Sequence, residues 1–398
     1  APNGIGKDEF WQALIEGRSG IDRITSFDAS DLPCQIAGEV KGFDPADYIS
    51  PKLVKRLPRV AQFAVAVARM AAEDAHLEDI RPQRIGVAFG TTLGKEDIFD
   101  GDHNLFLQKG WKSINLLLGE KYTSHFSTIH IAIELGAKGP VASFSSGCIT
   151  ITNAIDWGYH QIQNGYADAV VVAGTESMFF PFPFAIVCAR RLLSTSSNDQ
   201  PQKASKPFDM RRDGAVLSEG AGAIILEEQS CAFDRGANVY AELLGFSVSC
   251  EAVSVQEFDI TGKACAETIL AAIDRSSLHP SEIDYICATG TSTRNQDLGE
   301  TNAIKHAFGN RAYNIPISSI KSMIGHPDAA ATALQVITCC LALRNSIIPP
   351  TINYEIPDPE CDLDYVPNKA RVTRLRNVLI NAEGFGGNHS AIVLGIPR

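Results

Sequence analysis

Short apolar segments of strand length alternate with longer segments of helical period along this chain of 398 residues. The strand-like segments are residues 84–89, 167–173, 220–226, 283–287, 315–318, 377–380 and 391–394. The segments of helical period are residues 59–76, 149–164, 262–275, 298–307 and 328–345. Strands that are apolar on both faces need helices on both sides, so the alternation predicts an α/β fold with covered sheets.

Two segments of the chain share one design. Residues 167–227 and 377–396 each contain an apolar strand, glycine-rich turns and a closing apolar strand. We therefore expect two similarly built halves, residues 1–235 and 236–398, which meet at the polar segment 228–240.

Three segments lack a clear period and are predicted to leave the core. Residues 91–127 and 194–213 are irregular, polar or aromatic, and are expected to line a site or an interface. The aromatic run 178–184 is likewise expected either to line a pocket or to pack in an interface.

Charge and hydropathy exclude several kinds of partner. The net charge is −11, and the basic clusters are no longer than Arg190-Arg191 and Arg211-Arg212, which argues against double-stranded nucleic acid and anionic membranes. An acidic carrier protein would need a local basic patch. No apolar run reaches the roughly 20 residues of a membrane-spanning helix, and no signal peptide is recognised, so we expect a cytoplasmic location. The abrupt start at Ala1 suggests that a short native segment precedes it.

The ten cysteines show no spacing typical of a metal site. CxxC and CxxxH patterns are absent, so we expect no zinc site and no other metal. Most cysteines lie in apolar segments, which indicates reduced, buried thiols. Glycine-rich phosphate-binding motifs are also absent between strand and helix, so no nucleotide cofactor is predicted.

Cys148 stands at the end of a small-residue run, Gly139–Gly147, and just before an apolar, β-branched segment. This pattern predicts a strand, a tight turn and a helix, with the thiol in the first helical turn. The N-terminal end of a helix favours an anion, so we expect this thiol to ionise more readily than a free cysteine and to act as a nucleophile. The alternative is a buried structural cysteine.

Four later motifs add polar groups that could work with this thiol. They are the charged, glycine-rich segment 207–222, the hydroxyl-rich strand end 284–293 followed by Asp297 and Glu300, the Lys321-to-His326 segment, and the glycine turn 381–390. Taken singly, each also fits an ordinary turn, helix start or exposed cation.

Together, the order and spacing of these motifs resemble the β-ketoacyl-[acyl-carrier-protein] synthases of the thiolase superfamily over essentially the whole chain. In detail they resemble the elongating branch of fatty-acid and type II polyketide ketosynthases. This resemblance implies a duplicated, five-layered αβαβα thiolase-like fold. It also implies a dimer, with itself or with another ketosynthase-like subunit. The acyl substrate would be carried on the phosphopantetheine of an acyl carrier protein, with no further cofactor.

The resemblance also implies roles for four residues. Cys148 corresponds to the acyl-accepting nucleophile, and His326 to the second catalytic histidine, which assists decarboxylation of a malonyl extender and stabilises the enolate oxygen. Lys321 corresponds to the lysine beside it. Phe385 corresponds to the gating phenylalanine, and its N–H and that of Cys148 correspond to the oxyanion hole.

The chain departs from the family pattern at three places. Where the family has Ala-His-Gly-Thr-Ser-Thr, this chain has Thr289 at the position of the first catalytic histidine. A hydroxyl cannot replace an imidazole as a base at neutral pH. Where the family has Ser-Phe-Gly-Phe-Gly-Gly-Thr-Asn, this chain has Glu383 in place of the first phenylalanine and His389 in place of the final asparagine. Gln335 stands where a glutamate is expected. Glu383 or His389 could substitute for the missing base, or His389 could simply pack at a strand start.

Three functions remain open at this stage. The first is decarboxylative condensation of an acyl group on Cys148 with a malonyl-carrier-protein extender. The second is acyl transfer from Cys148 to another nucleophile without elongation, because Thr289 replaces a catalytic histidine. The third is a non-catalytic subunit that sets chain length for a competent ketosynthase partner.

Overall fold

The computed structural model describes residues 1–92, 102–114, 118, 123, 125–255 and 258–397. Its two main sheets follow one another along the chain. The first has the order β4-β3-β5-β6 and the second the order β7-β13-β12-β8-β9. Their bounds are β3 (Ile85–Gly90), β4 (Val141–Phe144), β5 (Ala169–Glu176), β6 (Gly220–Glu227), β7 (Glu242–Cys250), β8 (Tyr285–Cys287), β9 (Ile317–Ser318), β12 (Asn377–Gly384) and β13 (Asn388–Gly395).

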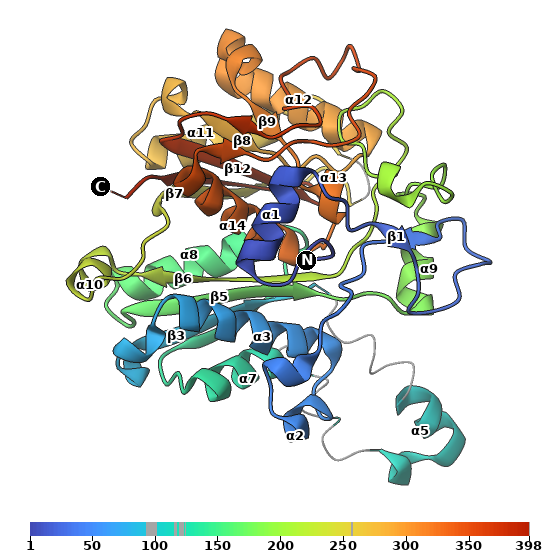
Figure 1. Cartoon of the computed structure of the whole chain (residues 1–398), viewed down its shortest axis with the longest axis vertical. Helices are drawn as coiled ribbons and strands as arrows, with labels where there is room; N and C mark the ends of the chain where they lie inside the picture. The colour runs from blue at the N-terminus through green and yellow to red at the C-terminus, as the bar shows by residue number, and fades with distance from the viewer. Residues whose placement is uncertain (93–101, 115–117, 119–122, 124, 256–257, 398) are drawn as a thin grey trace.

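Helices cover both sheets on both faces and so build five layers (Figure 1). α3 (Arg59–Asp74) and α7 (Phe126–Leu135) pack on the outer face of the first sheet. α8 (Thr150–Gln163) and α14 (Ala330–Asn345) lie between the two sheets. α11 (Lys263–Arg275) and α12 (Arg294–Phe308) pack on the outer face of the second sheet. The arrangement is the predicted αβαβα architecture.

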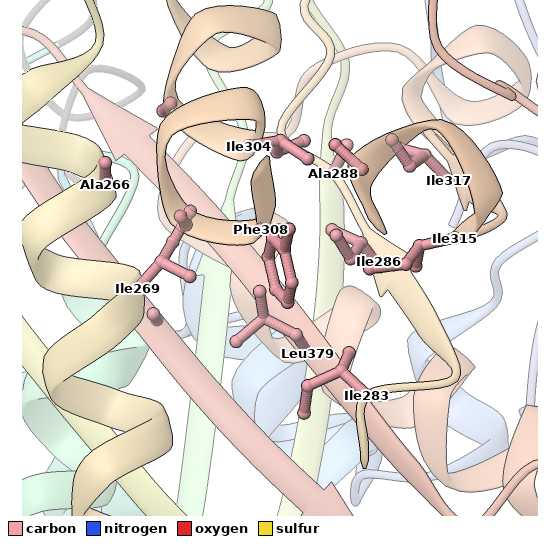
Figure 2. Close-up of a cluster of buried hydrophobic side chains, with 14 of the residues drawn as sticks. Ala266, Ile269, Ile283, Ile286, Ala288, Ile304, Phe308, Ile315, Ile317 and Leu379 are labelled. Carbon is pink, nitrogen blue, oxygen red and sulfur yellow. The ribbon is translucent and has the colours of Figure 1, made fainter. Parts of the chain in front are cut away.

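The outer layer of the second sheet is held by a continuous apolar cluster (Figure 2). Ile269 from α11 and Ile304 and Phe308 from α12 meet Ile286 of β8 and Leu379 of β12. All five side chains are buried, and the apolar area that they remove from water is the main force that fixes these helices on the sheet.

The remaining elements are short and surround this frame. The short helices include α1 (Lys7–Glu16), α2 (Pro51–Val54), α5 (Asn104–Lys109), α9 (Pro181–Ala189), α10 (Gln229–Asp234) and α13 (Lys321–Ile324). Two antiparallel two-stranded sheets pair β1 (Asp22–Arg23) with β2 (Ile36–Ala37) and β10 (Ile347–Ile348) with β11 (Arg371–Val372).

The predicted strands and helices appear close to their expected positions. The segment 194–213 is irregular apart from a short 3₁₀ turn, as expected. The segment 91–127 is not wholly irregular, because it contains α5. Phe99, which belongs to that segment, lies outside the described residues. The division into halves at residues 235 and 236 stays a prediction.

Two chain-wide expectations can be compared with the structure. Across the described part of the chain, none of the helices has the length and apolar character needed to cross a bilayer. All ten cysteines are free thiols. Seven of them are buried, and Cys250 is exposed.

Candidate active site

Cys148 lies in the turn between β4 and α8, at the inner end of a helix that is enclosed by both sheets. Gly147 makes the turn possible, because its φ of 62° belongs to the left-handed region that glycine adopts at little cost. α8 begins at Thr150, so Cys148 precedes the helix by two residues and is not in its first turn. Thr332 of α14 donates to the Cys148 carbonyl at 2.9 Å and anchors this turn.

Two polar side chains from the segment just before α14 contact the Cys148 sulfur. His326 places Nε2 3.2 Å from Sγ, and Asp328 places Oδ1 3.3 Å from Sγ. Thr92 donates to the same Asp328 oxygen at 3.3 Å. The His326 backbone is fixed by its own N–H, which donates to Val216 O at 2.7 Å. A thiol, an imidazole and a carboxylate therefore meet at one point.

This setting does not favour the thiolate, and the expectation of an easily ionised thiol is wrong. Burial and the facing Asp328 carboxylate raise the pKa of Cys148 well above its ordinary value, although the Lys321 charge acts in the opposite direction. Burial also raises the pKa of Asp328. The position before the helix therefore matters less than the loss of water and the nearby negative charge.

His326 is neutral over the physiological range. Burial and the positive charge of Lys321 lower its pKa to about 3. A neutral imidazole can donate a hydrogen bond, but here it is a weak acceptor for the Cys148 proton. Its Nδ1 is buried and finds no hydrogen-bond partner among the described residues.

Asp328 is a site residue that the sequence interpretation missed. The segment 328–345 is expected to be helical, but α14 begins only at Ala330. Asp328 instead adopts a φ of 36°, a strained conformation for a residue with a side chain. This conformation accompanies the placement of its carboxylate beside Cys148, and only a tertiary contact reveals it.

Lys321 and Thr289 lie together behind His326. Both are buried, and the Lys321 ammonium donates to the Thr289 carbonyl at 2.9 Å. The Thr289 hydroxyl donates to the Asn381 carbonyl at 3.1 Å. Burial lowers the pKa of Lys321.

Gln335 and Glu300 organise the backbone around Thr289. The Gln335 amide donates to Ala288 O at 3.0 Å and to Asn381 O at 3.1 Å. The Glu300 carboxylate accepts from the Thr289 N–H at 2.7 Å and from the Gly290 N–H at 2.8 Å. The two Gln335 hydrogen bonds link the end of β8 to β12 next to Thr289.

The glycine turn after β12 approaches Cys148 from the second sheet. A Cβ at Gly384 would lie only 3.3 Å from the Cys148 backbone nitrogen, so glycine permits this close approach. The next residue, Phe385, is 37% exposed, and its ring packs against the Arg190 guanidinium at 4.6 Å. The N–H of Phe385 and that of Cys148 therefore belong to neighbouring backbone segments at the mouth of the site.

Glu383 and His389 belong to a separate cluster on the outer side of β12. Glu383 accepts from the Cys265 thiol at 3.2 Å and from the Asn381 amide at 3.2 Å, while His389 Nε2 lies 3.3 Å from Glu251 Oε2. Burial and the charge of Glu300 raise the pKa of Glu383 to about 8. In the described residues, neither side chain forms a hydrogen bond with Cys148 or His326.

The aromatic segments divide between packing and surface. Phe179 and Phe184 are buried in an apolar cluster with Val216, so most of the run 178–184 is packing, although Phe182 is 68% exposed. Trp111 is 72% exposed. A cavity of about 1230 Å³ lies elsewhere, between α3, β6 and α10, and neither Cys148 nor its polar partners line it.

Comparisons with known proteins identify relatives of this chain. The family model "Beta-ketoacyl synthase, N-terminal domain" matches residues 1–232, and "Beta-ketoacyl synthase, C-terminal domain" matches residues 240–355. The chain is 40% identical to the 3-oxoacyl-[acyl-carrier-protein] synthase 2 of Synechocystis, over 98% of this chain and 94% of that protein. It is 41% identical to the tetracenomycin polyketide synthase ketoacyl synthase alpha subunit of Streptomyces glaucescens, over 100% of this chain and 95% of that protein.

Solved structures give the same result. The ketosynthase of a type II polyketide acyl-carrier-protein complex, bound to a hexaketide, superimposes with a TM-score of 0.93 at 32% identity, covering 100% of this chain and 97% of that one. The ishigamide ketosynthase/chain length factor superimposes with a TM-score of 0.92 at 31% identity and the same coverage. With its thiolase-like fold and its match to both family models, this chain belongs to the β-ketoacyl synthase family, and it is similar to ketosynthases of fatty-acid and type II polyketide synthesis.

Proposed function

We propose that this protein is a condensing ketosynthase. It takes an acyl chain from a carrier-protein thioester onto Cys148 and joins it to a malonyl unit. The observation that carries this proposal is the meeting of Cys148 Sγ with His326 Nε2 at 3.2 Å and Asp328 Oδ1 at 3.3 Å. The relatives in fatty-acid and polyketide synthesis support the same reaction class.

In the loading step Asp328 serves as the base. The Cys148 sulfur attacks the thioester carbonyl while its proton passes to the Asp328 carboxylate, and the N–H groups of Cys148 and Phe385 receive the oxyanion. The bond to the phosphopantetheine sulfur then breaks, and the departing thiolate takes the proton from Asp328. Asp328 fits this role better than His326, because the pKa of His326 is lowered to about 3.

In the condensing step His326 stabilises the negative charge. Loss of CO2 from the malonyl group leaves its electron pair as an enolate, whose oxygen accepts a hydrogen bond from His326 Nε2. The enolate carbon attacks the acyl carbonyl and the bond to Cys148 breaks. The Cys148 thiolate then regains a proton from solvent through Asp328. Lys321, buried behind the imidazole, adds a fixed positive charge to the site.

Thr289 is the weak point of this mechanism. Its hydroxyl donates to the Asn381 carbonyl, so it is not directed at an enolate beside Cys148. Loss of one such donor typically lowers a rate by about 10²–10³-fold. This observation favours a second candidate, acyl transfer to an alcohol, amine or thiol without elongation, for which Asp328 would also supply the base.

A third candidate, the non-catalytic chain-length subunit, is less well supported. Such a subunit would have no use for a thiol that contacts both an imidazole and a carboxylate. We propose instead that this chain is the reactive partner of a homodimer or heterodimer and that it receives acyl carrier protein. Arg190, which packs against Phe385, and the next residue in the chain, Arg191, are both exposed and would provide the local positive charge that an acidic carrier needs.

The test follows Cys148 by intact mass. The protein is first incubated with acyl-acyl-carrier-protein and then with malonyl-acyl-carrier-protein whose carboxyl group is isotopically labelled. Acylation followed by release of labelled CO2 supports condensation. Acylation without decarboxylation would replace condensation by acyl transfer, and absence of acylation would leave only the chain-length role.

Two variants sharpen this test. Cys148→Ala should abolish the acyl adduct. Thr289→His places an imidazole at this position and should raise the decarboxylation rate by about 10²-fold. A rate unchanged by Thr289→His would show that Thr289 does not limit the native reaction.

A further inference from the structure

A second group of reactive side chains lies on the side of β12 that faces away from Cys148. Glu383 of β12 and His389 of β13 are direct cross-strand partners in the antiparallel pair, so their side chains share one face of the sheet. Cys265, in the first turn of α11, packs against this pair. All three residues are buried, and one ligand atom from each lies within 4.8 Å of the others.

Two atoms in this group have no hydrogen-bond partner in the described part of the chain. They are His389 Nδ1 and Glu251 Oε1, and both are buried. The side chains of His389 and Glu251 are only 6% and 4% exposed. Buried polar atoms are nearly always satisfied, so each unsatisfied one requires an explanation.

The other two side chains of the group already have partners. Glu383 accepts hydrogen bonds from the Cys265 thiol and from the Asn381 amide, both at 3.2 Å. Among the described residues, His389 Nδ1 is therefore the atom of this trio that lacks a partner. A dication bound at Nδ1 would supply it.

We propose that Cys265, Glu383 and His389 form a binding site for zinc or a chemically similar dication. Thiolate, imidazole and carboxylate are the donors that zinc prefers, and these three side chains would supply three ligands of its usual tetrahedral set. His389 binds through Nδ1, and its Nε2–H donates to Glu251, which fixes the ring and its tautomer. On binding, the metal displaces the proton of the Cys265 thiol to solvent.

A metal ion bound here would stabilise the turn next to Cys148. Glu383 directly precedes Gly384, which packs against Cys148, and successive residues of a strand point to opposite faces. The ion would join α11, β12 and β13 and hold the turn from Gly384 to Gly387. Its role is structural, because the ligands do not contact Cys148.

The experiment measures metal directly. Untagged protein is purified without chelator for elemental analysis, and metal-free protein is then titrated with Co²⁺. We expect about one zinc per chain and a thiolate-to-cobalt charge-transfer absorption at one equivalent. A chain without metal that also shows no such absorption with Co²⁺ overturns the proposal.

Matched variants locate the ion, because Cys148, His326 and Asp328 also lie within 4.8 Å of one another. Cys265→Ser should abolish the cobalt absorption, and His389→Asn should weaken metal binding by on the order of 100-fold. Cys148→Ser should leave both unchanged. If Cys148→Ser removes the absorption and Cys265→Ser keeps it, the ion is bound at the active site and the inference is overturned. Glu383→Gln, which keeps the side-chain shape, provides a further test should Cys265→Ser fail to fold.

Discussion

At the scale of single residues, the proposed mechanism depends on the contact of Asp328 with Cys148. A thiol whose pKa is raised by burial and by a facing carboxylate is not stored as a thiolate. In the proposed mechanism it loses its proton as it attacks, and Asp328, whose Oδ1 lies 3.3 Å from the sulfur, accepts that proton. The neutral His326 would then stabilise negative charge.

The substitution Asp328→Asn therefore tests whether Asp328 accepts the Cys148 proton or only contacts the thiol. The amide keeps the shape but cannot take the proton, so single-turnover acylation of Cys148 at pH 7 should fall by about 10²-fold or more. Quenched-flow mass analysis measures this rate. Thr92→Val, which removes only a hydrogen bond to Asp328, is the matched control and should have a much smaller effect. An Asp328→Asn rate within about threefold of the natural protein would refute the assignment.

His326 makes stability depend on pH. Its pKa is about 3 in the folded protein, against about 6.5 when unfolded. Below pH 6.5 the unfolded chain binds a proton that the folded protein does not, so stability falls between pH 6.5 and 3. From pH 6.5 to 5 the loss should be about 1–2 kcal/mol. Urea unfolding at both pH values measures it, and His326→Asn should reduce the difference. An equal pH dependence in both proteins would contradict this account.

At the scale of elements, the sequence predicts regular segments better than it predicts the site. The long helices α3, α8 and α11 show clear periodicity and begin and end within a few residues of their predicted bounds. β7 was not predicted, because glycine and serine interrupt its apolar residues. β12 is longer than its apolar run, since Asn381 and Glu383 are buried only with the help of polar partners from other elements.

The turn that follows β12 gives a prediction at this scale. Gly384→Ala would place a methyl group 3.3 Å from the Cys148 nitrogen and push the two backbones apart. We expect acylation to fall by about tenfold or more, as small displacements at a reacting centre do. Gly386→Ala is the control, because no atom lies within 4 Å of its added carbon, although its φ of 81° costs some stability. Equal acylation rates in both variants would argue against a role for this contact.

At the scale of the whole molecule, residues far apart in sequence build both sites. Cys148 meets His326 and Asp328 only because α8 and α14 lie together between the sheets. Motif order and family resemblance predict the first two of these residues, whereas Asp328 carries no motif signal. The Cys265 cluster could not be found from cysteine spacing, because its proposed ligands come from α11, β12 and β13.

Assembly follows from the edge of the first sheet. β4 is an edge strand, Val141 on it is 42% exposed, and Ile129 and Ile133 of the neighbouring α7 are also exposed. We expect this apolar surface to pair with a second ketosynthase-like subunit. Light scattering should show a dimer for the natural chain and a monomer for Val141→Lys. Val372→Lys, at an exposed position on β11, should remain dimeric. A natural chain that is monomeric alone and dimerises only with another subunit would point to a heterodimer.

The central claim, that Cys148 carries an acyl group to a new carbon–carbon bond, is tested most directly by a single-turnover balance. Protein already acylated on Cys148 is mixed with malonyl-acyl-carrier-protein, and the loss of adduct, the CO2 released and the β-ketoacyl product are counted together. The account predicts equal amounts of all three, at a rate slowed by Thr289 but lost in His326→Ala. An adduct that survives malonyl-acyl-carrier-protein, yet leaves at once to an added amine or alcohol, would contradict it.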